Sequence, residues 1–233
     1  MHKFPWPALV VLVLAACAAP QRGQAPAAPP PVVVAPPPAE PVPGRESWTV
    51  VSSQLAIRVY RDGPMQKLGH DHVITSGALT GQVALGESLT ETSFELSVPL
   101  ESLVVDDEAS RQAAGGVFAA PVPQKDREAT RTNMLGAKVL DAATQSAIRL
   151  TSESITAEAG RYEARVRVSL AGHESVVSAP FSVTLEGDQL KAQADIRLTH
   201  ADLGLQPFTV ALGALRVRED LEVALTLEAR RRS

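Results

Sequence analysis

His70 and His72 are the residues best suited to chemistry, in the stretch KLGHDHVITSG over residues 67–77. On a β-strand, residues i and i+2 point to the same side, roughly 6–7 Å apart, so the two imidazoles could share one ligand. Imidazoles bind zinc and haem iron, and they also donate and accept hydrogen bonds to the polar head of an amphiphile. The simplest alternative is a strand that begins with polar residues.

A metal site needs three or four ligands, and the other candidates, His173 and His200, are distant in the sequence. The sequence does not bring them to the pair, so we assign no metal ligand and no cofactor. It contains no serine elbow, HExxH helix or phosphate loop. The pair Asp106-Asp107 is typical of a helix cap rather than of an acid–base couple. We therefore expect no catalytic residue, and we predict that the protein is not an enzyme.

The beginning of the chain indicates export. Residues 1–16 have a basic start and an apolar run too short to span a bilayer, which is typical of a signal peptide. They precede Cys17, the only cysteine, in LAAC, which resembles the lipobox of bacterial lipoproteins. This resemblance implies lipid attachment at Cys17; an ordinary signal peptide with an incidental cysteine is the alternative. Ala18 is not the aspartate that retains many lipoproteins at the inner membrane, which favours an outer-membrane lipoprotein facing the periplasm.

Residues 17–45 are rich in proline and alanine and almost free of charge. Proline fixes φ and removes an amide donor, so this segment is predicted to be a disordered, extended tether. Residues 46–233 are numerous enough for one domain with a hydrophobic core. The formal net charge of −4 gives no reason to expect nucleic acid as a partner.

From Trp48 onward the hydrophobic period is two, which predicts β-strands. The run 161–170 alternates apolar and polar residues, and 179–198 is a hairpin that turns at Gly187-Asp188. About eight such runs with short turns favour sequential antiparallel pairing, and segments 106–116 and 126–136 are predicted to be helical. The sequence therefore predicts an all-β fold, an antiparallel barrel of about eight strands with one or two short helices.

The composition favours a barrel whose apolar face points inward. A transmembrane barrel needs aromatic girdles, and aromatic residues make up only 4% of this chain. Barrels of about eight strands either fill with side chains or hold one small ligand. Ala164, Ala192 and Ala194 are small residues on the predicted inner face, so we expect an apolar cavity rather than a filled core.

Several motifs occur in an order that carries a resemblance: SQLAIRV, GALTGQV, NMLGAKVLDAATQSAIRLTS, YEARVRVSLAGHESVVSAPFSV and THADLGLQP. They span about 48–229 and resemble the YceI-like polyisoprenoid-binding family. The residues at the family's most specific positions are Asp141, Ile148, Asp202, Gly204 and Leu205, whereas Val139 and Leu140 replace phenylalanines. The resemblance implies a lipocalin-like antiparallel barrel that carries a long isoprenoid chain in its bore.

An isoprenoid tail has few polar atoms, so its affinity must come from burying carbon, at roughly 25 cal/mol per Å². The inward residues predicted to provide this surface are Val166, Val168, Phe181, Val183, Ile196, Val223 and Leu225. We expect His70 and His72 at the mouth, against a quinone carbonyl, phenol or phosphate head.

The hypothesis is a membrane-anchored envelope lipoprotein whose barrel binds or carries a polyisoprenoid, an isoprenoid quinone-like lipid or a similar amphiphile. The alternatives are a metal- or haem-binding envelope module that uses His70 and His72, and a structural or interaction domain without a ligand.

Overall fold

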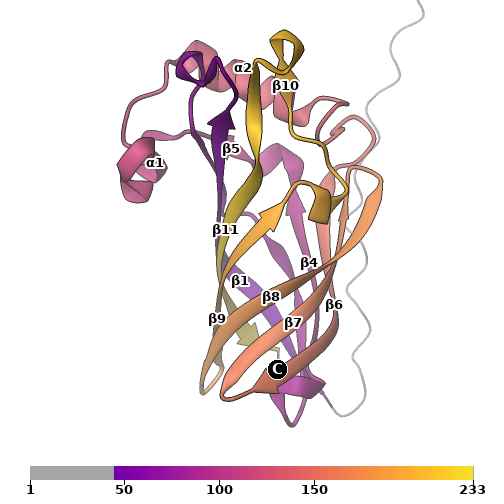
Figure 1. The fold of residues 1–233 in the computed structure, drawn as a ribbon. Helices are drawn as coiled ribbons and strands as arrows, with labels where there is room; N and C mark the ends of the chain where they lie inside the picture. The colour runs from indigo at the N-terminus through magenta and orange to yellow at the C-terminus, as the bar shows by residue number, and fades with distance from the viewer. Residues whose placement is uncertain (1–44, 233) are drawn as a thin grey trace, which may run out of the picture. The chain divides into compact units, whose positions relative to one another are not determined.

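The structure is a computed structural model that describes residues 45–232 (Figure 1). Its strands are β1 (Glu46–Asp62), β2 (His72–Ser76), β3 (Thr80–Leu85), β4 (Ser93–Pro99), β5 (Val104–Val105), β6 (Ala147–Glu158), β7 (Arg161–Leu170), β8 (His173–Glu186), β9 (Gln189–Thr199), β10 (Thr209–Val210) and β11 (Leu215–Arg231). Its α-helices are α1 (Glu108–Ala114) and α2 (Gln124–Leu135). The predicted signal peptide, most of the predicted tether and Cys17 lie outside the described residues.

Short 3₁₀-helices occupy several of the connections between these elements. They are η1 (Gln66–Leu68), η2 (Leu89–Glu91), η3 (Leu100–Ser102), η4 (Gly116–Phe118), η5 (Ala201–Leu203) and η6 (Ala211–Gly213). Within residues 45–232, no helix has both the length and the apolar character needed to cross a membrane.

Eight of the strands close into an antiparallel barrel, as the sequence predicts. The order around the barrel is β1, β3, β4, β6, β7, β8, β9 and β11, and β11 pairs again with β1. The closing pair runs almost the full length of both strands, from Trp48 opposite Arg231 to Asp62 opposite Arg216. β1 also pairs with β3 through residues 46–49 and with β2 through residues 55–59.

The two ends of the barrel differ. The helix end, at the top of Figure 1, is the end where α2 and β10 lie and where β1 ends and β11 begins. The terminal end is the opposite one, where β1 begins and β11 finishes. There the buried side chains of Trp48 and Ala229 belong to the hydrophobic core, so the terminal end is filled.

The inner face of the barrel follows from the alternation of the sequence. In β7, Ala164, Val166 and Val168 are buried, and the charged residues between them are exposed. The hairpin between β8 and β9 turns after Glu186, at the predicted Gly187-Asp188. A right-handed, twisted sheet with one apolar face closes on itself so that this face is removed from water.

Both predicted helices are present. Asp107 caps α1, because its side chain accepts a hydrogen bond from the backbone N–H of Ser110. α2 begins at Gln124, two residues before the predicted start at Asp126, since Pro123 holds the N-cap position with extended backbone. α2 crosses the helix end of the barrel in Figure 1 and contributes side chains to the space below it.

Candidate ligand-binding cavity

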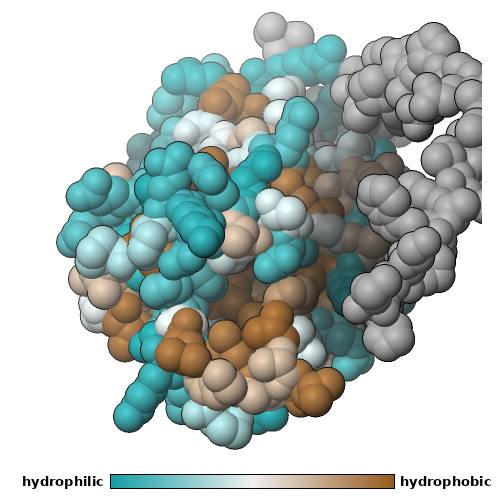
Figure 2. All heavy atoms as spheres, turned by 90° about the horizontal axis from the view of Figure 1, so that it is seen from above, coloured by the Kyte–Doolittle hydropathy of each residue, from teal (hydrophilic) through white to brown (hydrophobic). Residues whose placement is uncertain are grey.

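The barrel encloses a cavity of about 590 Å³. All eight barrel strands contribute to its wall, which consists almost entirely of apolar side chains. Figure 2 looks onto the helix end and shows a hollow with hydrophobic residues inside and hydrophilic residues around much of its rim. Cavities of a few hundred to a thousand Å³ with apolar walls are typical of small-molecule sites in proteins.

The structure places all seven predicted apolar residues on the cavity wall: Val166 and Val168 from β7, Phe181 and Val183 from β8, Ile196 from β9, and Val223 and Leu225 from β11. Ala164, Ala192 and Ala194 line the same space, so small side chains leave room in the bore. Val166 and Val168 are buried, whereas the other five predicted residues are partly accessible. Their contact with a ligand stays a prediction.

The two histidines also line the cavity, near its helix end. His70 lies just before β2 and His72 opens it, and their ring centroids are 6.2 Å apart. His70 Nε2 lies 3.3 Å from Asp126 Oδ2 on α2. Arg61, Thr130 and Asn133 line the same region, so polar groups gather at one end of an otherwise apolar space.

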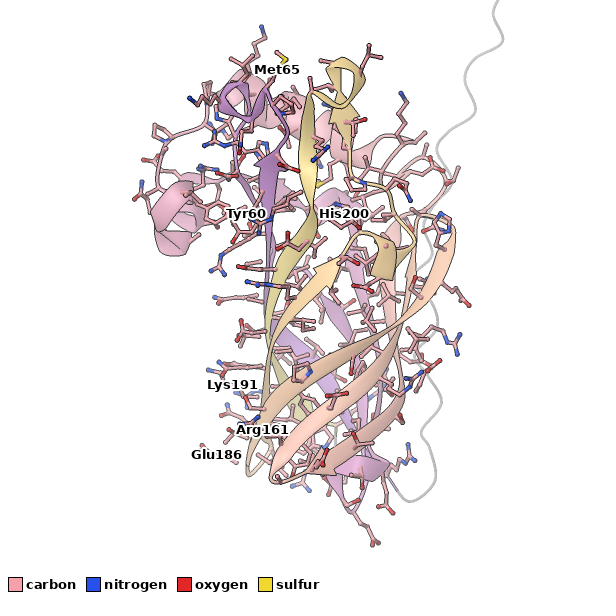
Figure 3. The ribbon with its side chains drawn as sticks, in the orientation of Figure 1. Tyr60, Met65, Arg161, Glu186, Lys191 and His200 are labelled. Carbon is pink, nitrogen blue, oxygen red and sulfur yellow. The ribbon has the colours of Figure 1, made fainter. Side chains whose placement is uncertain are left out.

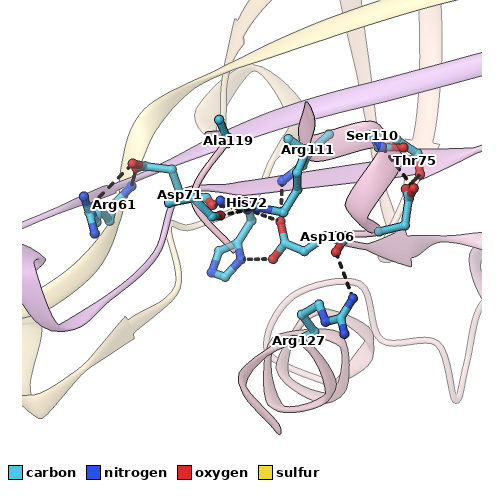
Figure 4. A network of polar contacts seen from close by, with 12 residues as sticks. Arg61, Asp71, His72, Thr75, Asp106, Ser110, Arg111, Ala119 and Arg127 are labelled. Carbon is cyan, nitrogen blue, oxygen red and sulfur yellow. Dashed lines mark hydrogen bonds and ion pairs between the residues drawn. The ribbon is translucent and has the colours of Figure 1, made fainter. Parts of the chain in front are cut away.

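His72 is held by a buried carboxylate. Its Nδ1 lies 2.6 Å from Asp106 Oδ2, and the side chain of Asp106 has no exposed surface (Figure 4). The backbone N–H of Val73 and Nη1 of Arg111 donate to Asp106 Oδ1, at 2.9 Å and 2.6 Å. An ionised carboxylate only accepts hydrogen bonds, so Nδ1 of His72 carries a proton and Nε2 is the nitrogen left for a ligand.

Burial alone would raise the pKa of Asp106. The hydrogen bond and the charge of His72 outweigh that effect, together with the donors from Val73 and Arg111, so the pKa of Asp106 lies below its ordinary value. Asp106 is therefore the charged anchor of His72.

The predicted helix-cap role of the Asp106-Asp107 pair is correct for Asp107 and wrong for Asp106. Asp106 has φ of 55°, which turns its carboxylate away from the helix and toward β2. Its backbone N–H donates to the carbonyl of Val73 at 2.8 Å. Asp106 and Val73 are far apart in the sequence, so no local pattern connects them. The only signal in the sequence was the pair of adjacent acidic residues.

His173 and His200 do not complete a metal site with His70 and His72. His200 lines the cavity, and its Nδ1 lies 2.8 Å from the carbonyl oxygen of Glu219. His173, the first residue of β8, lies beside Gly204, where an added Cβ would be 3.0 Å from its side chain, and it does not line the cavity. Among residues 45–232, no three or more His, Cys, Asp or Glu side chains are grouped so that they could hold a metal ion.

The chain is similar to one protein family and to several solved structures. The family model described as the YceI-like domain matches residues 48–229. BcnA from Burkholderia cenocepacia aligns with a TM-score of 0.54 and 11% identity, covering 76% of this chain and 95% of that one. A YCEI protein from Campylobacter jejuni aligns with a TM-score of 0.47 and 8% identity, covering 66% and 82%. The comparison with curated proteins gives no match.

Proposed function

Since the chain belongs to the YceI-like domain family, we propose that its barrel binds or carries a polyisoprenoid, an isoprenoid quinone-like lipid or a similar amphiphile. The observation that carries this proposal is the cavity of about 590 Å³ with apolar walls and a polar end. The family is associated with binding hydrophobic ligands rather than with catalysis, so a binding role accounts for the cavity without a reaction.

The chemistry of the wall favours an apolar hydrocarbon chain. Each CH₂ group buried contributes about 0.8 kcal/mol, so an apolar chain of ten or more carbons provides ample gross binding energy. No charged side chain is needed along the bore for such a tail. At the helix end, Nε2 of His72, the ring of His70 and the guanidinium of Arg61 provide partners for a polar head.

The location belongs to the same proposal. We propose that the chain is a lipoprotein anchored through acylated Cys17 and that it faces the periplasm from the outer membrane. The motif LAAC and the proline-rich residues 17–45 support this proposal. A protein that carries a membrane lipid gains from staying at the membrane, because exchange then occurs over a short distance.

Titration with dansylated farnesol tests the binding proposal. Ala194 lines the cavity, so Ala194→Phe places a ring in the bore and should weaken probe binding at least about tenfold. The control Asp195→Phe adds the same ring to the exposed side of the same strand and should leave the affinity unchanged. Equal probe affinity of the two variants, or no uptake of the probe by the wild type, would contradict the proposal.

Native mass spectrometry of the protein purified from bacterial membranes identifies the ligand class. An added mass that organic solvent extracts supports a lipid. An added mass that a chelator removes, or the absorption spectrum of haem, would instead favour the alternative based on His70 and His72.

A further inference from the structure

Four apolar side chains are exposed on two neighbouring turns at the helix end. Met65 and Leu68 belong to the turn that contains η1, and Val210 and Leu212 belong to the segment of β10 and η6. Leu68 is 70% exposed and Leu212 is 110% exposed, the full value for an open chain. We refer to Met65, Leu68, Val210 and Leu212 as the apolar tip; Figure 3 labels Met65 at the top of the barrel.

The two turns of the apolar tip are joined to each other. The backbone N–H of Met65 donates to the carbonyl of Ala214 at 2.8 Å. Arg216 Nε donates to Asp62 Oδ2, also at 2.8 Å, at the base of the two turns. A Cβ at Gly63 would lie 2.6 Å from the carbonyl oxygen of Ala214, so the backbones approach closely. These contacts therefore hold the two turns of the apolar tip in a fixed arrangement.

The backbone at Leu212 is unusual for a leucine. Its φ of 55° and ψ of 33° lie in the left-handed region, which side chains with a Cβ rarely adopt. This conformation sends an apolar side chain into water, where it gains no packing in the barrel. A costly conformation that exposes an apolar residue is typical of a contact surface.

The apolar tip continues into the cavity. Leu68 and Val210 belong to the apolar tip and also line the cavity, and so do Phe208 and Leu215 from the neighbouring positions. An apolar molecule that leaves through this side of the helix end therefore passes along apolar side chains. Lys67, between Met65 and Leu68, is exposed and places a positive charge beside the apolar tip.

We propose that the apolar tip inserts into the surface of a lipid bilayer, so that the cavity opens toward the membrane. A bilayer fits the three observations together: it accepts exposed leucine and methionine, it attracts Lys67 through anionic headgroups, and it dissolves the tail of the proposed cargo. The purpose of the contact rests on the proposed lipid cargo, whereas the contact itself is measurable without any cargo.

The length of the chain before β1 is compatible with this contact. β1 begins at the terminal end, so the barrel's length separates that point from the apolar tip. The 17 residues of β1 extend about 56 Å at roughly 3.3 Å per residue. Residues 17–45 can span at most about 100 Å, at roughly 3.3–3.6 Å per residue. A chain anchored at Cys17 can therefore turn its helix end toward the membrane that holds it.

Sedimentation with vesicles tests the proposal. The chain from residue 18 to 233 is mixed with vesicles of equal parts phosphatidylethanolamine and phosphatidylglycerol, so that no acyl anchor contributes. The test variant combines Met65→Gln with Leu212→Asn, because asparagine tolerates the left-handed backbone and neither residue lines the cavity. Its vesicle partition coefficient should fall roughly tenfold, since both apolar side chains are lost from the contact.

The matched control combines Val51→Thr with Leu185→Thr. These apolar side chains are each about half exposed, and they lie in β1 and β8 near the terminal end. The control should sediment like the wild type. Equal sedimentation of the two double variants, or no sedimentation of the wild type, would overturn the proposal. Leu212→Asn alone gives the same comparison if the double variant does not fold.

Ligand binding, the proposed function, is tested by a separate measurement from the membrane contact. Dansylated farnesol titrated without vesicles should bind the Met65→Gln, Leu212→Asn variant as it binds the wild type. Loss of sedimentation with intact probe binding supports the membrane contact. Normal sedimentation of the wild type in the absence of any probe binding would leave the membrane contact standing and remove the lipid cargo.

Discussion

At the scale of single residues, the contacts of Asp106 decide how His72 is presented to the cavity. Arg111, which is also buried, donates to Asp106 and to the carbonyl oxygens of Asp71 and Ala120. These bonds tie α1 to the start of β2. Buried charges are tolerated when each has its partners, and the cost appears when one partner is removed.

Asp106→Ala should therefore reduce the free energy of unfolding by about 3–5 kcal/mol, because it leaves Arg111 charged and buried without a carboxylate. Asp107→Ala is the matched control. It removes the helix cap from Ser110 and the hydrogen bond from Thr75 and should cost about 1–2 kcal/mol. Urea denaturation at neutral pH measures both values, and similar losses in the two variants would contradict the assigned roles.

The lowered pKa of Asp106 also predicts a pH dependence. The folded state binds the proton less tightly than the unfolded chain, in which an aspartate has a pKa of about 3.9. The stabilisation is therefore complete above that value and is lost as the pH falls through the lower, folded pKa. In urea titrations from pH 5 downward, the wild type should lose stability more steeply than Asp106→Ala. Parallel pH profiles would show that Asp106 contributes nothing to acid sensitivity.

The sequence was sufficient to predict the inward positions of residues on the cavity wall. It was not sufficient to predict the contact of Asp106 with His72. The inward positions of Val166 and Val168 follow from a period of two, which any strand imposes on its own side chains. The link from Asp106 to His72 depends on a left-handed turn and on the folding of α1 against β2, which are tertiary facts.

At the scale of elements, the pairing of β3 with β4 leaves no room for a Cβ at Gly81. Its φ is +147°, and a Cβ there would lie 2.1 Å from the carbonyl oxygen of Glu95 and 2.8 Å from Cα of Leu96. Both obstacles are backbone atoms, which cannot move without disturbing the pairing between Gly81 and Leu96. A glycine in the middle of a strand commonly marks such a contact.

Gly81→Ala should cost about 4 kcal/mol or more in the free energy of unfolding, because it combines steric overlap with an unfavourable φ. Gly160→Ala in the turn between β6 and β7 is the control. Its φ is +76° with nothing within 4 Å of the added Cβ, so the loss should be only about 1–2 kcal/mol. Thermal or urea unfolding measures both losses, and a smaller loss for Gly81→Ala than for Gly160→Ala would contradict the steric overlap at Gly81.

Long elements were predictable and short ones were not. The hairpin of β8 and β9 has long alternating runs around a Gly-Asp turn, so the pattern defines both strands and turn. β5 and β10 contain two residues each, which is too few for any period to be read. These short strands exist because β2 and β11 offer them free backbone partners.

At the scale of the whole molecule, the proposed anchor determines where the barrel works. Cys17→Ser should abolish the incorporation of labelled palmitate, because the thiol that carries the acyl group is lost. Ala18→Asp keeps the acylated cysteine and is the control, and it should remain in the pellet. Labelling with palmitate followed by cell fractionation measures acylation and membrane association of both variants. Incorporation of labelled palmitate into the Cys17→Ser protein would contradict acylation at this residue.

The closure of the barrel lay beyond what the sequence could predict in detail. β1 and β11 are separated by most of the chain, and local patterns contain no information on which distant strands pair. The count of about eight strands nonetheless made closure the expected solution, because an open sheet would expose edges. The small alanines predicted the cavity, since the chain has few bulky aromatic side chains to fill it.

The meeting of β1 and β11 at the terminal end has a practical consequence. The backbone N–H of Arg232 donates to the carbonyl of Ser47 at 2.8 Å, so the first and last described strands leave the barrel side by side. Fusion partners, affinity tags or a solid support joined through either strand would all attach at the base. The barrel could thus be displayed in dense, oriented arrays with every helix end facing away from the support.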